Sequence, residues 1–385
     1  MNQPAVIQKS LFYSEEHEAF RDQVRRFVAK EITPNAYKWD EAGEFPRDLY
    51  FKAAEVGVLQ TGFPEEYGGV PADRFFSLIV QQELSKGGSG GVVAGLANHR
   101  IVLPTLVRAA SADLKMRVMP GVLSGEKITA LACTEPTGGS DVANIRTTAR
   151  RDGDYYVVSG EKTFISSGLR ADFFVVVVRT GGPGAKGLSL LLVERDTEGL
   201  ARTPLKKMGW LSLDTVTLYF DQVRVPVGNV IGEEGKGFSI LAANFNDERL
   251  GLAASSIAFA ALAYEEALNY ARIREAFGKS IIHHQVIRHK LVDMAQRIAA
   301  SQAFLELSTW QMDQGMDPVV DLCMLKNQAT QTFAFCASEA VQIFGGAGYL
   351  RGATVERLYR EVKVNAIGGG TEEIMKELAA KQLRF

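Results

Sequence analysis

The texture of the chain changes twice along its length, and these two changes constrain its fold more than any other feature. Up to about residue 126, and again after residue 235, apolar residues recur at helical spacing. Between them, short β-rich runs such as YYVVSGEKTFI and FFVVVV are separated by Gly, Asp, Pro and Thr at a spacing of roughly ten to twenty residues. We therefore expect a multidomain α+β protein with an N-terminal helical domain (1–126), a barrel-like middle β domain (127–235) and a C-terminal helical bundle (236–385).

Several helices can be predicted individually. Ser14 is a plausible N-cap, because two glutamates follow it and apolar residues then recur with helical periodicity. Further helical segments are expected near 75–84 and 92–110 in the first third. Alanine-rich segments predict long helices in the last third, near 239–274, 284–312 and 318–344.

Composition and charge argue against several classes of protein. With 43 Lys and Arg against 45 Asp and Glu, the net charge is -2, so we expect no nucleic-acid partner. Cys133, Cys323 and Cys336 lie far apart in no metal or disulfide spacing, which favours a reducing compartment and no metal site. The N-terminal twenty residues resemble no targeting segment, and no apolar run approaches membrane-spanning length. We expect a cytoplasmic bacterial protein that binds no membrane.

Three apparent motifs do not support the nucleotide or metal sites that they suggest, and a surface or cofactor-contacting role is the better interpretation of the histidines at 283–284. GAGYLRG at 346–352 has an incorrect final glycine spacing for a dinucleotide fingerprint and follows a helical segment. FGKS at 277–280 ends like a P-loop, but Ile273 stands where the first glycine should be. The histidine pair at 283–284 has no acidic or Cys partner spaced to complete a metal site.

The segment ALACTEPTGGSD, residues 130–141, is dense in glycine and small polar residues where the chain enters the β region. Such a loop presents backbone N–H groups and hydroxyls, which suit a polar ring or a phosphate. By composition alone, a solvated turn is an equally good interpretation.

Five motifs in order, ACTEPTGGSD, GEKTFIS, REAFGKSI with HHQ, QIFGGAG and GGTEEI, resemble those of the acyl-CoA dehydrogenase family of flavoproteins. The resemblance covers nearly the whole chain and implies the acyl-CoA dehydrogenase fold with FAD as cofactor. It places one part of the chain along the flavin ring, where hydrogen bonds tune the reduced ring and Phe164 replaces a frequent Trp. These residues are Leu131, Ala132, Cys133, Thr134, Gly139, Ser140, Phe164, Ile165 and Ser166, with Thr371 and Glu373 from the last motif.

The resemblance also implies that a neighbouring subunit completes the cofactor site. One chain is expected to hold the pyrophosphate and adenine of its partner's FAD, which makes the protein a homo-oligomer, commonly a dimer of dimers. The residues expected in this role are Arg274, Phe277, His284, Gln285, Gln342, Ile343, Phe344, Gly345 and Gly346. An Arg fork suits a pyrophosphate, and glycines allow close approach of backbone.

The catalytic base poses a question, because Gly369 stands where many relatives carry a Glu. The chain could be a dead enzyme, could run a changed reaction, or could hold its base elsewhere. Isovaleryl-type and long-chain-type relatives hold the base on an earlier helix beside an Arg, and that register selects Glu248, followed by Arg249. Asp247 is the alternative, about 100° around the helix, and a solvent-facing Glu248 is the ordinary interpretation of such a residue. The Gly369 neighbourhood can still donate a backbone N–H to a thioester carbonyl.

The expected activity is FAD-dependent α,β-dehydrogenation of an acyl-CoA to a trans-2-enoyl-CoA, with electrons passed to an electron-transferring flavoprotein. The closing run favours a medium or long acyl chain, and the position of the base favours a 3-methyl-branched one, of which citronellyl-CoA is an example. Two alternatives are a nitroalkane-oxidase-like flavoenzyme and a silent flavin-binding module. The residues expected along the substrate are Ser140, Asn246, Asp247, Arg249 and Gly370.

Overall fold

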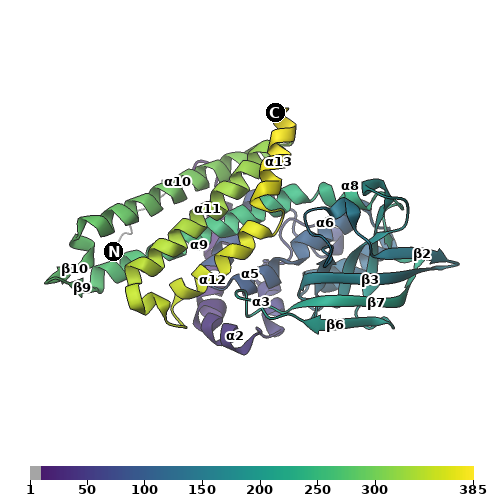
Figure 1. Ribbon diagram of the computed structural model, residues 1–385, viewed down its shortest axis with the longest axis horizontal. Coiled ribbons are helices and arrows are strands. Elements are labelled where there is room, and N and C mark those ends of the chain that lie inside the picture. Colours follow the sequence, from purple (N-terminus) through teal and green to yellow (C-terminus); the bar gives the residue numbers. More distant parts are fainter. Residues whose placement is uncertain (1–9) are drawn as a thin grey trace.

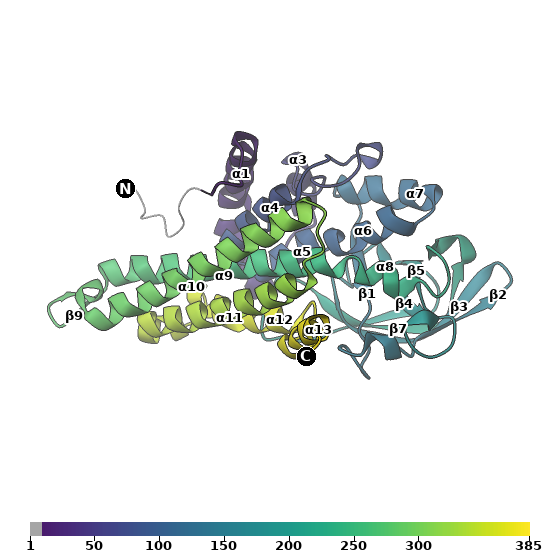
Figure 2. The same cartoon turned by 90° about the horizontal axis from the view of Figure 1, so that it is seen from above.

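A computed structural model describes residues 10–385 of the chain. The helices and strands follow one another in the expected order, with helices, then strands, then long helices. The β region lies at one end of the molecule and the long C-terminal helices extend toward the other, with the N-terminal helices covering one side of their junction (Figures 1 and 2). The first nine residues of the N-terminal stretch, for which no targeting segment was expected, lie outside the described part.

The N-terminal third is helical, as predicted. Helix α1 begins directly after Ser14, whose side chain accepts a hydrogen bond from the His17 N–H, while the His17 ring accepts from the Ser14 N–H. This reciprocal pair caps the helix. The helices are α1 (Glu15–Phe27), α2 (Ala36–Ala42), α3 (Asp48–Glu55), α4 (Arg74–Lys86), α5 (Gly90–Ala97), α6 (His99–Ala109) and α7 (Ala112–Leu123).

The segment Gly90–Ala109 qualifies the expectation that no apolar run approaches membrane-spanning length. It has 20 residues with a mean hydropathy of 1.2, which is long and apolar enough by composition. The predicted helix here is two helices, α5 and α6, which meet at Asn98. Because 72% of the segment's most apolar window is buried inside the protein, its composition is that of a core element.

The middle third forms one eight-stranded sheet with the order β6-β7-β3-β2-β4-β5-β8, in which β1 pairs with β4. The predicted β-rich runs are the long strands β3, β4, β5 and β7. Between Lys162 and Ile165 the pairing of β3 with β7 shifts register, which marks a bulge. The strands are β1 (Thr129–Ala132), β2 (Thr148–Asp152), β3 (Tyr155–Ser166), β4 (Phe173–Arg179), β5 (Leu188–Glu194), β6 (Leu200–Pro204), β7 (Thr215–Pro226) and β8 (Val230–Ile231).

The C-terminal third is a bundle of long helices around α9, with a small hairpin, β9 and β10, at its far end (Figure 2). Small residues on α9, mostly alanines, let neighbouring helices approach closely. The elements are α8 (Gly237–Ala242), α9 (Phe245–Ile273), β9 (Glu275–Ala276), β10 (Lys279–Ser280), α10 (Gln285–Asp313), α11 (Val319–Phe344), α12 (Thr354–Ile367) and α13 (Glu372–Leu383).

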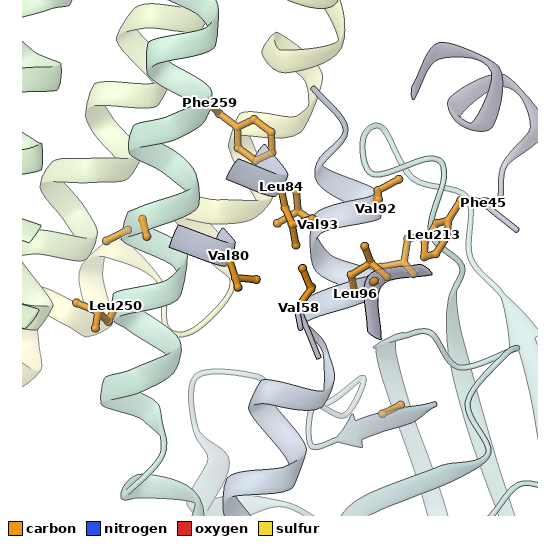
Figure 3. Close-up of a cluster of buried hydrophobic side chains, with 14 of the residues drawn as sticks. Phe45, Val58, Val80, Leu84, Val92, Val93, Leu96, Leu213, Leu250 and Phe259 are labelled. Carbon is orange, nitrogen blue, oxygen red and sulfur yellow. The ribbon is translucent and has the colours of Figure 1, made fainter. Parts of the chain in front are cut away.

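A large hydrophobic cluster contains residues from all three parts of the chain (Figure 3). Val80 and Leu84 come from α4, Leu250 and Phe259 from α9, and Leu213 from the middle third. All five side chains are buried. The start of α9 therefore belongs to the same buried cluster as α4 and the middle third. The domain boundaries at 126/127 and 235/236 remain a prediction.

Candidate functional site

Glu248 and Gly369 lie side by side, although 121 positions separate them in the chain. Glu248 is in the first turn of α9, and Gly369 is in the turn between α12 and α13. A Cβ built on Gly369 would lie 3.6 Å from Glu248 Oε1 and 2.5 Å from Leu252 Cδ1. The Glu248 carboxylate thus occupies the space next to the position where a side chain at 369 would begin.

The surroundings of Glu248 favour a proton acceptor. Burial raises the pKa of its carboxyl group, while Arg249 and Lys326 act in the opposite direction. The Glu248 carboxylate also acts on the Cys133 thiol. Burial raises the pKa of Cys133 to about 11, and the negative charge of Glu248 contributes to this rise. Glu248 therefore lies beside the glycine turn and within electrostatic range of Cys133, which follows β1. A carboxyl group with a raised pKa holds an abstracted proton more strongly than an ordinary one.

Asp247, the alternative base, points elsewhere. Its Oδ1 accepts a hydrogen bond of 2.8 Å from Arg74 Nε at the start of α4. The same guanidinium bonds Asp313 Oδ1 at 3.0 Å, at the end of α10. The Asp247 carboxylate is thus held in an exposed ion-pair network on another face of α9 from Glu248.

Arg249 and Asn246 connect the start of α9 to the loop that follows α10. Arg249 is 8% exposed, and its Nη1 donates to Asn246 Oδ1 at 2.9 Å. The Asn246 amide in turn donates to Asp317 Oδ1 at 2.8 Å. Of the residues expected along the substrate, these two lie within one turn of Glu248, and Gly370 adjoins Gly369. Ser140 is exposed on the loop after β1.

A buried ion pair underlies the loop at 130–141. Lys162 Nζ bonds Glu135 Oε1 at 2.9 Å and the Cys133 carbonyl at 3.1 Å, and both charged side chains are almost fully buried. The Glu135 carboxylate also accepts the N–H groups of Arg146 and Thr147. Within residues 10–385, the N–H groups of Gly139 and Ser140 have no acceptor. The buried side of the loop is therefore anchored by Glu135 and Lys162, and its exposed side presents the N–H groups of Gly139 and Ser140.

Phe164, one of the residues expected along the flavin, has an unusual backbone conformation. It lies in the bulge of β3 with a φ of 60°, and its side chain is 68% exposed. A left-handed backbone is rare and costly for a bulky residue. Its neighbour Ile165 is buried, so the bulge turns one apolar side chain into the core and the next one outward.

The second expected set of cofactor residues gathers at the far end of the bundle (Figure 2). Phe277 and Gly278 form the two-residue turn of the β9–β10 hairpin, both with positive φ, and the Phe277 side chain is 94% exposed. Tyr270 of α9 stacks on Phe344 of α11 with ring centroids 4.2 Å apart. The end of α11 therefore lies beside the end of α9, close to the hairpin. A Cβ on Gly345 or Gly346 would meet no heavy atom within 4 Å.

Within one chain, the two sets are too far apart to share one ring. Glu248 and Tyr270 are 22 positions apart on α9, which is about 33 Å along a helix. The first set includes Leu131 and Ala132 on β1 and Ser166 at the end of β3, whereas Arg274, His284, Gln285, Gln342 and Ile343 belong to the second. Thr371 caps α13 and Glu373 is exposed in its first turn, one and three residues beyond the glycine turn.

The residues of the first set fit a flavin ring. An isoalloxazine has a flat apolar face and a polar edge that needs donors. Phe164 offers an outward apolar ring, and Gly139 and Ser140 offer N–H groups without an acceptor among the described residues. No group of three or more His, Cys, Asp or Glu side chains arranged to hold a metal occurs in the described part of the chain.

Three residues in this region were not identified from the sequence. Lys162 lies inside the motif GEKTFIS, but its buried partner Glu135 is 27 residues away. Arg74 pairs with Asp247 across 173 residues. Lys326 donates to the carbonyl of Gly370 across 44 residues. The one available sequence signal was Lys326 itself, a charged residue among the apolar residues of LCMLKNQA.

Comparison with known families and proteins gives a consistent result. Three family models match: the N-terminal domain of acyl-CoA dehydrogenases at residues 14–126, the middle domain at 130–223 and the C-terminal domain at 235–384. The mitochondrial long-chain specific acyl-CoA dehydrogenase of Sus scrofa is 34% identical over 376 residues, covering 96% of this chain and 87% of that protein.

Two solved structures extend the comparison. An acyl-CoA dehydrogenase from Geobacillus kaustophilus has a TM-score of 0.95 and 38% identity, covering 98% of this chain and 100% of that one. A structure described as the electron transferring flavoprotein of Acidaminococcus fermentans contains a chain with a TM-score of 0.93 and 30% identity. That match covers 97% of this chain and 99% of the other.

Proposed function

Because the chain belongs to the acyl-CoA dehydrogenase family, we propose that Glu248 is its catalytic base and that its substrate is a medium, long or 3-methyl-branched acyl-CoA. The protein is an FAD-dependent oxidoreductase that acts on the CH–CH bond of acyl-CoA thioesters. What the proposal adds is the residue that removes the proton and the class of acyl chain.

One observation carries the assignment of the base. The Glu248 carboxylate lies 3.6 Å from the position that a Cβ on Gly369 would occupy. A carboxylate on α9 and one on residue 369 would therefore compete for the same space, and the glycine makes room for Glu248. Asp247 does not compete, since Arg74 holds it in an ion pair on another face of α9.

The residues then divide the reaction among them. Glu248 accepts the proton of the substrate α-carbon. FAD, when bound, supplies the two-electron acceptor for the hydrogen that leaves the β-carbon with its bonding electron pair. The α,β single bond becomes a double bond, so the products are a trans-2-enoyl-CoA and reduced FAD. Negative charge that develops on the thioester carbonyl is stabilised by the Gly369 N–H, which has no acceptor within the described residues.

The cofactor is held by residues of two subunits in this proposal. Residues 131–140 and 164–166 of one chain line the flavin ring, and the hairpin at Phe277 with the glycines at 345–346 binds the remainder of a partner's FAD. The separation of about 33 Å along α9 and the 94% exposure of Phe277 support this division. It requires a homo-oligomer, for which we propose a dimer of dimers.

The natural electron acceptor is proposed to be an electron-transferring flavoprotein, and the location cytoplasmic. The chain of similar fold in the Acidaminococcus fermentans structure supports the first of these. The 34% identity to a long-chain specific relative supports a long acyl chain, and the placement of the base on α9 supports a branched one equally well.

Anaerobic bleaching of the flavin absorbance tests the proposal. Octanoyl-CoA, isovaleryl-CoA and citronellyl-CoA are added separately to wild type, and the fastest bleaching ranks the acyl chains. Nitroethane is the comparison substrate. Bleaching by a thioester but not by nitroethane is the expected result. Bleaching by nitroethane alone, or by none of the compounds, would overturn the proposal.

A further inference from the structure

The turn between α12 and α13 has few restraints of its own. It consists of Gly368, Gly369 and Gly370, of which the last two have φ values of 65° and 99°. The Gly368 N–H closes α12 on the Val364 carbonyl, and Thr371 caps α13. Glycines lose more conformational freedom on folding than other residues. A turn of this kind needs a contact from outside to keep one geometry.

Lys326 of α11 supplies such a contact. Its side chain is fully buried, and its Nζ donates to the Gly370 carbonyl at 2.6 Å and to the Ala366 carbonyl at 3.1 Å. One acceptor precedes the three glycines and the other ends them, so a single ammonium group bridges the turn. Ala366 lies in the last turn of α12, where the helix dipole is negative and favours a cation.

The two carbonyls that Lys326 holds flank the Gly369 N–H, which is the proposed hydrogen-bond donor to the thioester carbonyl. The C=O and N–H of a trans peptide lie in one plane, so holding a carbonyl fixes the orientation of its peptide unit. Gly369 lies between the two carbonyls that Lys326 holds. The carbonyl of Ala366 orients the 366–367 peptide unit and that of Gly370 orients the 370–371 unit, so the 368–369 unit, which carries the Gly369 N–H, lies between two anchored units. Glu248 Oε1 is 3.6 Å from the Cβ position of Gly369.

Lys326 also acts on Glu248 through its charge. The charged and titratable groups that act on it are Glu372 on α13, Glu248 and Arg249 on α9, and Cys323 on its own helix. Burial lowers the pKa of Lys326 to about 8, against the opposing effect of Glu372 and Glu248. In the reverse direction, the ammonium group and Arg249 both act to lower the pKa of Glu248, against the larger effect of burial, which raises it.

We propose that Lys326 is a positioning residue for α-proton removal, which it assists by clamping the glycine turn against Glu248 and by placing a buried positive charge near that carboxylate. The inference rests on the proposed role of Glu248 and adds a second residue to it. Lys326 itself touches neither substrate nor cofactor in this assignment, since its Nζ is bonded to two backbone carbonyls.

The test isolates proton removal from oxidation. With 3-thiaoctanoyl-CoA, sulfur replaces the β-carbon, so the base can exchange α-hydrogens with D₂O but no β-hydrogen can leave. NMR follows this exchange on the holoenzyme between about pH 5.5 and 9. In Lys326→Met we expect exchange to slow by about 10- to 100-fold, the size of effect that a small misplacement of reacting groups produces. We also expect the apparent pKa of the exchange profile to rise.

A conservative variant separates the clamp from the charge. Lys326→Gln keeps a hydrogen-bond donor without the cation. Compared with Lys326→Met, it is expected to exchange faster, while the apparent pKa of its exchange profile stays as high as in Lys326→Met. Lys207→Met is the matched control: Lys207 is a half-buried lysine whose Nζ also donates to a backbone carbonyl, that of Leu213, in the β region. This control is expected to lose stability and to keep the wild-type exchange profile.

The outcomes are distinguishable. An unchanged rate and profile in Lys326→Met, with FAD bound, would overturn the inference, as would an equal shift in Lys207→Met. If Lys326→Met fails to bind FAD, Lys326→Gln carries the test, and a wild-type profile in it would refute the role of the charge. Absence of exchange in wild type itself would instead refute the proposed function.

Discussion

Replacing Gly369 by alanine tests whether the turn is shaped to leave space beside Glu248. At a φ of 65°, an L-residue costs about 1–2 kcal/mol, of which about 0.4–1 kcal/mol is offset because alanine restricts the unfolded chain. The new Cβ would also lie 2.5 Å from Leu252 Cδ1, and moving that side chain adds about 1–3 kcal/mol. The expected net cost is about 3 kcal/mol. For a domain of 150 residues such as 235–384, this lowers Tm by about 6–12 °C.

Leu252→Ala provides the control for this prediction. It removes the methyl group that a Cβ at 369 would meet. The decrease in Tm of the double variant should therefore be smaller than the sum of the decreases in the two single variants. Calorimetry on the FAD-loaded protein measures the three variants and wild type. Additive losses, or an unchanged Tm in Gly369→Ala, would refute the contact between residue 369 and Leu252.

Three further predictions concern charged groups. Asp247→Asn should leave the rate of flavin bleaching within a few-fold of wild type, because an exposed ion pair contributes at most about 1 kcal/mol; a loss of 100-fold would return Asp247 to the role of base. Lys162→Met should cost about 3–5 kcal/mol and release FAD, because it leaves Glu135 buried and unpaired; calorimetry and the absorbance of retained flavin measure both. Burial raises the pKa of Glu361 to about 7. The native state then keeps a proton that the unfolded state releases at lower pH, so the free energy of unfolding should decrease as the pH rises from about 4.5 to 7. Glu361→Gln should therefore raise Tm at pH 8 but not at pH 4.5.

The order of the three parts and most long helices could be predicted from the sequence because they depend on local periodicity. Helix α11 begins one residue after the predicted start and ends at Phe344 as predicted. The predicted helix at 92–110 is two helices, since a break at Asn98 leaves the apolar pattern on both sides intact. The bulge at Phe164 could not be predicted, because it depends on the register between β3 and β7.

Candidate site residues could be proposed from the sequence where a motif contained them, and their contacts could not be predicted where the partners lay far along the chain. Spacing on a helix separates Asp247 from Glu248 by about 100°, but it does not say which of them faces the glycine turn. The ion pair between Arg74 and Asp247 distinguishes them. Lys326 was missed for the same reason, since its two acceptors are backbone carbonyls 40 and 44 residues away.

The most direct test of the central claim is the rate constant of anaerobic flavin reduction in Glu248→Gln beside wild type, measured with the thioester that bleaches wild type fastest. Each protein is assayed with the ordinary substrate and with its α-dideuterated form. The account predicts a slower reaction of the deuterated substrate in wild type, and a loss of about 10²–10⁴-fold in Glu248→Gln with FAD still bound. Reduction of the FAD in Glu248→Gln within ten-fold of the wild-type rate would contradict the account and place the base elsewhere.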